Sequence, residues 1–226
     1  STPIKSSAAS DVYKRQGLGA AIAKHYSLLA REVCRLPREA QHFAWLDLNT
    51  EEGQEYWMSM NLAGDYARAC HERIHLNLAK ALGLKPLANV NNHHNFAWKE
   101  EIIPGRISIV HRKGATPAQK GQAGLIPGSM ATPGYLVCGK GVEEALNSAS
   151  HGAGRAMSRQ KAKDSFTQSA LKKLLSQAGV TLIGGSVEEM PLAYKDIDRV
   201  MYTQETLVEV QGKFMPVSYT HLTLPT

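Results

Sequence analysis

Hydrophobic positions in the first third of the chain recur at helical spacing. Residues 20–34 (AAIAKHYSLLAREVC) place apolar side chains three and four positions apart, which predicts an amphipathic helix. A second and longer helix is predicted up to about Leu82, where Gly83 follows as a stop signal. Asn49 with Glu52 three positions later is a capping-box pattern, and it indicates where this second helix begins.

After Pro86 the pattern changes to shorter apolar runs. Residues 96–98 and 107–110 predict two strands, joined by a turn at Pro104-Gly105. Further strands are predicted at 135–138 and 180–183, a loop at 114–128, and helices at about 152–163, 165–178 and 195–211. Helices mixed with short strands in this order predict an α+β fold in which mixed β-sheets are flanked by helices.

The two ends of the chain differ from the rest. Residues 1–16 (STPIKSSAASDVYKRQ) show no period, and residues 217–226 (VSYTHLTLPT) carry no charge. Both segments resemble translated adapter sequence, so we exclude them from fold reasoning. We expect residues 17–216 to be one partial domain that is truncated at both ends.

Composition narrows the class of protein. The chain is 43% hydrophobic and 20% charged, as in ordinary globular proteins. No apolar run is long enough to cross a bilayer, and the three widely spaced cysteines fit a reducing compartment. We therefore expect a cytoplasmic protein without a membrane partner. The net charge of +6 suits an anionic partner.

The segment SHGAGRAMSR at residues 150–159 carries the strongest chemical signal. His151 lies among small residues, and Arg155 and Arg159 follow it at steps of four, so on a helix the three would share one face. Glycines beside a helix start let the backbone approach an anion. A neutral imidazole can attack phosphorus without a separate base. The segment predicts a phosphate-handling site with a histidine nucleophile.

Four motifs occur in order along the chain: HHNFA at 93–97, VHRKGAT at 110–116, IPGSM at 126–130 and SHGAGR at 150–155. The later residues EEMP at 188–191 accompany them. Together these motifs closely resemble the RtcB family of RNA-splicing ligases, over most of residues 17–216. The resemblance implies an RtcB-like fold.

The resemblance also implies a reaction. Members of this family use GTP and Mn²⁺ to join an RNA 3′-phosphate or 2′,3′-cyclic phosphate end to a 5′-hydroxyl end, as in tRNA splicing and RNA repair. The nucleophile that becomes guanylylated corresponds to His151, and a manganese ligand corresponds to His94. Nucleotide contacts fall on Asn95, Pro127, Gly128, Ser129, Met130, Gly152, Ala153 and Gly154. Arg155 and Arg159 are expected to stabilise phosphoryl charge. A basic rim for the RNA backbone is expected from His111, Arg112, Lys113 and Lys120.

Some features of the family have no match in this sequence. Its other metal ligands are an Asp, a Cys and histidines in NHF and HSGSRG motifs, and a C-terminal lysine contacts guanine; we expect the chain alone to be inactive without them. Ala131 stands where a glycine is usual, and Gly134 stands where some members have a serine. Two other functions stand as alternatives to an RNA ligase. The protein could be a non-catalytic RNA-binding member of the same fold or a metal-dependent phosphohydrolase.

Overall fold

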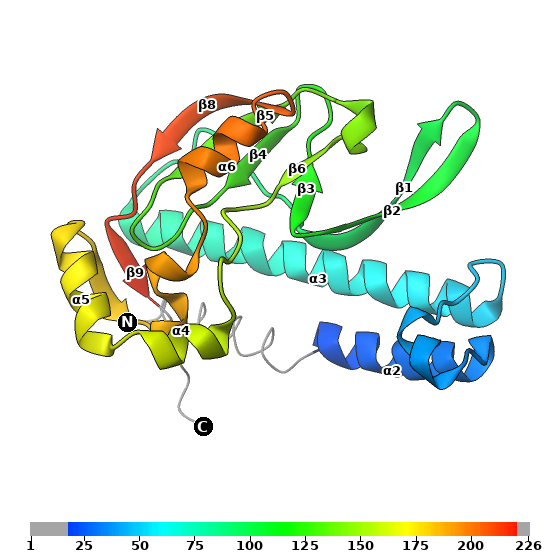
Figure 1. The fold of residues 1–226 in the computed structure, drawn as a ribbon. Helices are drawn as coiled ribbons and strands as arrows, with labels where there is room; N and C mark the ends of the chain where they lie inside the picture. The colour runs from blue at the N-terminus through cyan, green and yellow to red at the C-terminus, as the bar shows by residue number, and fades with distance from the viewer. Residues whose placement is uncertain (1–17, 221–226) are drawn as a thin grey trace. The chain divides into compact units, whose positions relative to one another are not determined.

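The computed structural model describes residues 18–220. The described chain forms two compact units, which divide between Leu87 and Ala88 (Figure 1). The leader predicted at 1–16 lies outside the described residues. None of the helices within residues 18–220 combines the length and the apolar character that crossing a membrane requires.

The first unit is helical, as predicted. It contains α2 (Leu18–Cys34), the short 3-10 helix η1 (Arg38–Phe43) and α3 (Glu51–Leu82). α2 packs on α3, where the hydroxyls of Tyr26 and Ser59 lie 3.1 Å apart. Gly83 adopts the left-handed conformation that ends α3, so this predicted stop is confirmed.

The predicted start of α3 is wrong by one residue. The N-cap is Thr50, whose hydroxyl accepts a hydrogen bond from the Gly53 N–H at 3.3 Å. Asn49 instead donates its side-chain amide to the Asp47 carboxylate at 2.9 Å. Both residues are good caps by type, and the bond to Asp47 leaves the cap to threonine.

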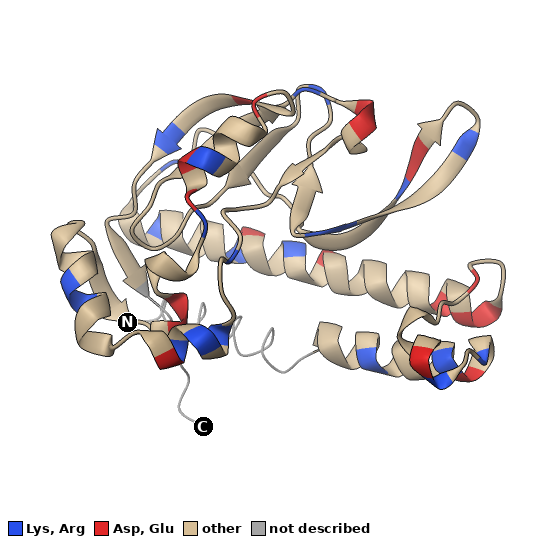
Figure 2. Cartoon of the chain, viewed as in Figure 1, with Lys and Arg blue, Asp and Glu red and all other residues tan. Residues whose placement is uncertain are grey.

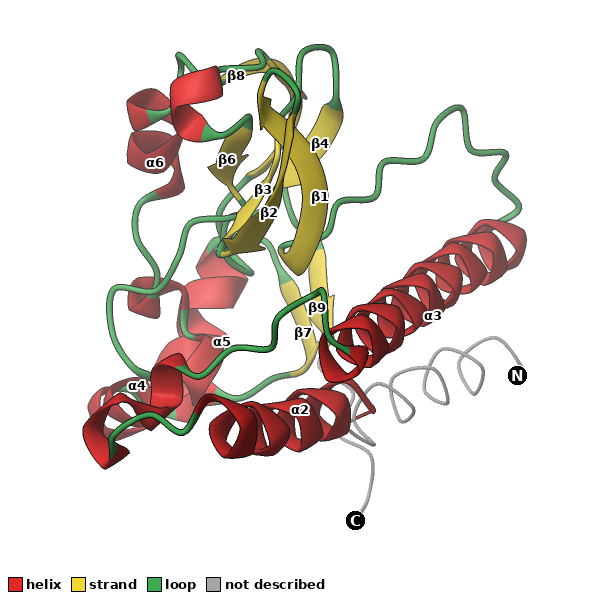
Figure 3. Cartoon of the chain, turned by 90° about the vertical axis from the view of Figure 1, so that its right-hand side faces the viewer, coloured by secondary structure: helices red, strands yellow, loops and turns green. Residues whose placement is uncertain are grey.

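The second unit begins with a long β-hairpin. β1 (Asn95–Ile103) pairs antiparallel with β2 (Arg106–Lys113), and the turn lies at Pro104-Gly105 as predicted. Gly105 has a φ of +77°, which a glycine adopts without strain. Figure 3 shows the hairpin as a curved ribbon, with β3 following directly from β2.

Three further small sheets complete this unit. β3 (Ala115–Pro117) pairs with β6 (Ser148–Ser150), and the order of the three-stranded antiparallel sheet is β4 (Ala123–Ile126), β5 (Gly134–Gly139) and β8 (Val208–Phe214). β7 (Thr181–Gly184) pairs in parallel with β9 (Ser218–Thr220). β9 therefore comes from the segment that the sequence analysis set apart at 217–226, whose last six residues lie outside the description.

The helices of the second unit are short. They are α4 (Arg159–Ser165), α5 (Gln168–Gln177) and α6 (Ile197–Thr203), with 3-10 turns η2 (Glu143–Ala145), η3 (Val187–Glu189) and η4 (Pro191–Ala193). The helix predicted at 165–178 and the strands predicted at 135–138 and 180–183 are confirmed within a few residues. Helices together with small sheets confirm the α+β fold class.

Three predictions for this unit are wrong. The loop predicted at 114–128 contains the strands β3 and β4. The helix predicted at 195–211 ends at Thr203 and gives way to β8, where Val208 and Val210 alternate with polar residues at the period of a strand. The helix predicted at 152–163 begins only at Arg159, because the Ser158 hydroxyl caps it there.

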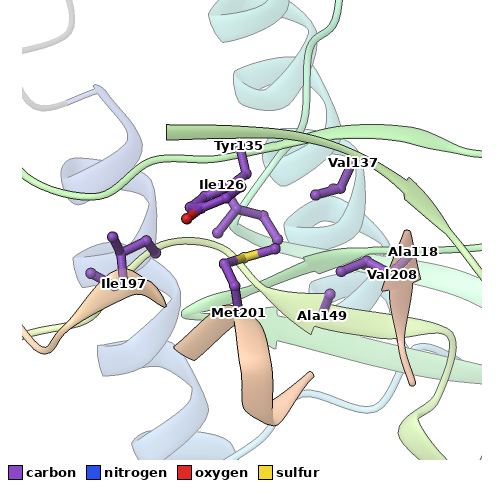
Figure 4. Packing of buried hydrophobic residues seen from close by; sticks show 9 residues of the cluster. Ala118, Ile126, Tyr135, Val137, Ala149, Ile197, Met201 and Val208 are labelled. Atoms are coloured by element: carbon purple, nitrogen blue, oxygen red, sulfur yellow. The ribbon is translucent and has the colours of Figure 1, made fainter. Parts of the chain in front are cut away.

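Two hydrophobic clusters form the interior of the second unit. The first gathers residues from the three-stranded sheet, β6, α6 and the segments just after β3 and β6, namely Ala118, Ile126, Tyr135, Val137, Ala149, Ala153, Ile197, Met201 and Val208. Figure 4 shows that Ile197 and Met201 of α6 lie in the same part of this cluster as Ile126 and Tyr135. The second lies around α4, α5 and η4, namely Met130, Ala162, Leu171, Leu175, Val180, Met190 and Ala193. The loop after β6 contributes Ala153 to the first cluster, and Met157 near its other end packs against the second cluster.

Candidate active site

Two histidines come together through the backbone of one glycine. The Gly114 N–H donates to the His94 carbonyl at 3.1 Å, and the Gly114 carbonyl accepts from the His151 N–H at 3.3 Å. The imidazole rings of His94 and His151 meet edge to face, with their centroids 4.7 Å apart. Gly114 has a φ of +74°, so the position favours glycine. The predicted nucleophile and the predicted metal ligand are therefore neighbours.

His151 is held in a form that suits a nucleophile. Its ring is half-buried, and its Nδ1 is buried without a hydrogen-bond partner among the described residues. Burial, and then the nearby charge of His94, lower the pKa of His151 below its usual value of 6.5, while a backbone hydrogen bond opposes this in part. The imidazole is therefore neutral at pH 7 and keeps a lone pair available for attack.

The predicted nucleotide loops lie against each other. The Ala153 N–H donates to the Pro127 carbonyl at 3.1 Å, which joins the HGAG segment to the PGSM segment. A Cβ on Gly152 would lie 3.0 Å from the same carbonyl oxygen, so glycine permits this approach. Gly128 is more confined, because its Cβ would lie 2.3 Å from the Pro133 carbonyl oxygen.

The PGSM segment turns through a hydroxyl network. The Ser129 N–H donates to the Thr132 Oγ1 at 2.6 Å, and that hydroxyl donates to the Ser129 Oγ at 2.9 Å. Met130 is 5% exposed and packs in the second hydrophobic cluster. Because the side chain is buried there, a ligand could contact Met130 only through its main chain. Asn95, by contrast, is exposed at the first position of β1.

The arginines of the SHGAGR segment do not lie on one helix face with His151, so that prediction is wrong. Gly154 has a φ of +71°, and the chain from His151 to Ser158 is not helical. Arg155 donates to the carbonyls of Met157 and Glu188 at 3.0 and 2.6 Å. Arg155 therefore stabilises the main chain of this loop and joins it to η3.

Glu189 is the partner that both arginines share. Its carboxylate lies 3.5 Å from the Arg155 guanidinium and 3.9 Å from that of Arg159, whose side chain is 71% exposed. The Tyr194 hydroxyl also donates to Glu189. Burial, and then Glu189, raise the pKa of Tyr194 to about 12, so this hydroxyl stays protonated. The EEMP motif was visible in the sequence, but nothing in its spacing indicated that Glu189 pairs with Arg155 and Arg159.

Arg112 is not part of a basic rim, contrary to the prediction. It is 2% exposed, and its guanidinium donates to both carboxylate oxygens of Glu100, at 2.7 and 2.8 Å. His111, Lys113 and Lys120 are exposed, as a rim requires. The alternation of β2 was the signal that could have revealed this, because it places Arg112 on the same face as the buried Val110.

Two buried or half-buried amides were also missed as site supports. Asn92 donates to the Thr116 hydroxyl at 3.0 Å and to the Leu125 carbonyl at 3.1 Å. The Gln204 Oε1 accepts from the N–H of Ser150, next to His151, at 2.8 Å. Each amide joins segments far apart in sequence, which no local pattern could show.

The described residues do not by themselves make a metal centre. Within residues 18–220, no group of three or more His, Cys, Asp or Glu side chains is placed to hold an ion. His94 offers one exposed imidazole beside His151. A transition-metal site needs more donors than this pair.

Comparison with known proteins shows that this chain is similar to RNA-splicing ligases. The chain is 34% identical to the RNA-splicing ligase RtcB of Escherichia coli (strain K12), over 86% of this chain and 51% of that protein. It is 31% identical to the tRNA-splicing ligase RtcB of Nanoarchaeum equitans, over 90% of this chain and 50% of that protein. The chain thus spans about half the length of these relatives.

The family model described as tRNA-splicing ligase RtcB matches residues 15–221. The chain belongs to the RtcB family, which confirms the resemblance found in its motifs. The match covers both compact units.

Proposed function

We propose that the complete protein is a GTP- and manganese-dependent RNA ligase. It would join RNA 3′-phosphate or 2′,3′-cyclic phosphate ends to 5′-hydroxyl ends, in tRNA splicing or RNA repair. The observation that carries this proposal is the half-buried His151, which has a lowered pKa and lies beside His94 at a glycine-rich loop. Family membership supports the same reaction.

For an RNA 3′-phosphate end the proposed reaction has three steps that balance; a 2′,3′-cyclic phosphate end must first be opened by water, which breaks the bond from phosphorus to the 2′-oxygen and leaves the 3′-phosphate. A nitrogen of His151 attacks the α-phosphorus of GTP, so that an N–P bond forms and the P–O bond to pyrophosphate breaks. An oxygen of the RNA 3′-phosphate then attacks the same phosphorus, takes up the GMP and restores the imidazole. The 5′-hydroxyl finally attacks the RNA phosphate, releases GMP and forms the phosphodiester.

The remaining residues have proposed roles in binding. Nucleotide contacts come from Asn95 and from the adjoining loops 127–130 and 152–154, whose backbones are joined by the bond from Ala153 to Pro127. His94 supplies one imidazole to Mn²⁺, and further donors come from the part of the family's length that this chain does not span. When bound, Mn²⁺ would neutralise charge on phosphoryl oxygens.

A chimaera tests this proposal. Residues 18–220 of this chain replace the matching half of the E. coli relative, and the folded protein is incubated with α-³²P-GTP and Mn²⁺. We expect an acid-labile label that His151→Ala abolishes. His111→Ala is the matched control, because His111 is an exposed histidine of the same unit and should leave the label unchanged.

Other outcomes separate the alternatives. Release of phosphate from RNA ends without any label would favour a phosphohydrolase. RNA binding by a folded chimaera that neither takes up label nor joins ends would favour a non-catalytic member. A label that persists in His151→Ala would contradict the assigned nucleophile.

A further inference from the structure

We infer that Arg112 and Glu100 are positioning residues that hold His94 and His151 in contact. The hydrogen bonds of Arg112 go to Glu100, Leu146 and Ser148. The pair acts through the backbone segments that lead to the two histidines. The inference rests on the proposed function only for the role of His151. The contact between the His94 and His151 rings can be measured without any catalysis.

The pair is built for a fixed geometry. Side-chain exposure is 1% for Arg112 and 12% for Glu100, and the guanidinium engages both carboxylate oxygens. The Arg112 guanidinium also lies over the Trp98 ring, 4.9 Å from its centroid. The planar guanidinium makes two parallel hydrogen bonds, and these fix both the distance and the relative orientation of Arg112 and Glu100. A lysine ammonium would not fix the orientation.

Arg112 reaches from the hairpin to the turn before β6. Its Nη2 donates to the Leu146 carbonyl at 2.8 Å, and its Nε donates to the Ser148 Oγ at 2.7 Å. The Ser148 hydroxyl in turn donates to the Leu146 carbonyl at 2.8 Å. One guanidinium thus satisfies Glu100 on β1 and two groups of a separate segment.

The turn that Arg112 holds is a strained one. Leu146 and Asn147 have φ values of 51° and 48°, in the left-handed region that non-glycine residues avoid. This conformation is unfavourable above all for Leu146, so the surroundings must stabilise the turn. Arg112 and Ser148 supply hydrogen bonds at its carbonyl.

The two tied segments lead directly to the histidines. β1 begins at Asn95, immediately after His94, and β6 ends at Ser150, immediately before His151. The residues between Ser148 and His151 form a strand paired with β3, so a shift at Ser148 is carried to the imidazole. The Arg112 pair therefore sets how the two rings meet.

Ring contact is the readout of the experiment. The experiment uses this chain labelled at histidine, in which we expect an NMR cross-peak between the ring protons of His94 and His151, whose centroids lie 4.7 Å apart. The double variant Arg112→Met, Glu100→Met replaces the buried pair by apolar side chains, a change that often preserves stability. We expect a folded protein in which this cross-peak is lost. Arg106→Gln, exposed on the same strand, is the matched control and should keep it.

A folded double variant that retains the cross-peak would overturn the inference. If the double variant does not fold, Ser148→Ala decides, because it removes one acceptor of Arg112 and leaves the ion pair intact. Weakening of the cross-peak in Ser148→Ala supports positioning, and an unchanged cross-peak rejects it. Loss of guanylylation in the chimaera with the ring contact preserved would instead count against the proposed function.

Discussion

At the scale of single residues, backbone groups of glycine and buried amides hold the candidate nucleophile in place. Gly114 bonds to the backbones of both histidines, and Gln204 bonds to the residue before His151. The motif residues were recognisable in the sequence because family patterns are local. Arg112 and Gln204 were not, since their partners Glu100 and Ser150 lie on other elements and a one-dimensional pattern does not show them.

Gly114→Ala should separate the two histidines. Open space surrounds the position, so the cost comes from its φ of +74° and is about 1–2 kcal/mol of unfolding free energy. Chemical denaturation measures that cost, and the NMR ring contact between His94 and His151 should weaken. Gly179→Ala is the control: its φ of +71° at the end of α5 should cause a similar loss of stability with the ring contact unchanged. An unaltered contact in Gly114→Ala would contradict this role.

Gln204→Leu should destabilise the second unit by about 1 kcal/mol, because it leaves the N–H of the half-buried Ser150 without this acceptor. Urea denaturation measures the change. Gln177→Leu, at an exposed position, should have little effect. Equal effects of the two variants would show that the Ser150 bond contributes nothing.

The lowered pKa of His151 predicts a pH dependence of stability. Since the folded state disfavours the charged imidazole, protonation costs more in the folded chain than in the unfolded chain. The unfolding free energy should therefore fall as pH drops below the unfolded pKa of 6.5 and level off below the folded pKa. Denaturation at several pH values should show a smaller fall in His151→Gln. An identical pH profile would reject the shift.

At the scale of elements, caps decided where the sequence predictions succeeded and failed. The long helix α3 was predictable because its apolar period continues for many turns and Gly83 ends it. The helix predicted from 152 failed because Gly154 and the Ser158 cap delay its start. Short strands such as β3 and β4 depend on pairing with distant segments, and their own three or four residues carry too little pattern.

Ser158→Ala should shorten α4 and cost about 1 kcal/mol of unfolding free energy, because the Lys161 N–H loses its acceptor. Ser165→Ala, exposed at the other end of the same helix, is the control and should cost much less. Thermal denaturation of both variants provides the comparison. If Ser165→Ala were the more harmful change, the cap assignment would be wrong.

At the scale of the whole molecule, the family extends across both compact units, yet the chemical motifs lie in the second one. Lys and Arg (blue) and Asp and Glu (red) are both spread over many elements in Figure 2, and several of the basic side chains have acidic partners. The mild positive charge predicted an anionic partner, but the motifs carried the argument. Charge alone would not have identified the site.

The division between the units predicts where proteases cut. Residues 84–89 are exposed and lie outside any helix or strand, and Leu87 is fully exposed. Limited chymotrypsin digestion should therefore cleave first at Leu84 or Leu87 and release two fragments that mass spectrometry can identify. First cleavage inside the three-stranded sheet would contradict the two-unit arrangement.

The bonds that Gly114 makes involve only main-chain atoms, and this has a practical consequence. Deleting the imidazole at position 151 removes the proposed nucleophile but keeps both of the amide contacts that shape its surroundings. A His151→Ala chimaera should therefore retain a vacancy of the right form, into which free imidazole added to the buffer could diffuse and restore part of the lost reaction.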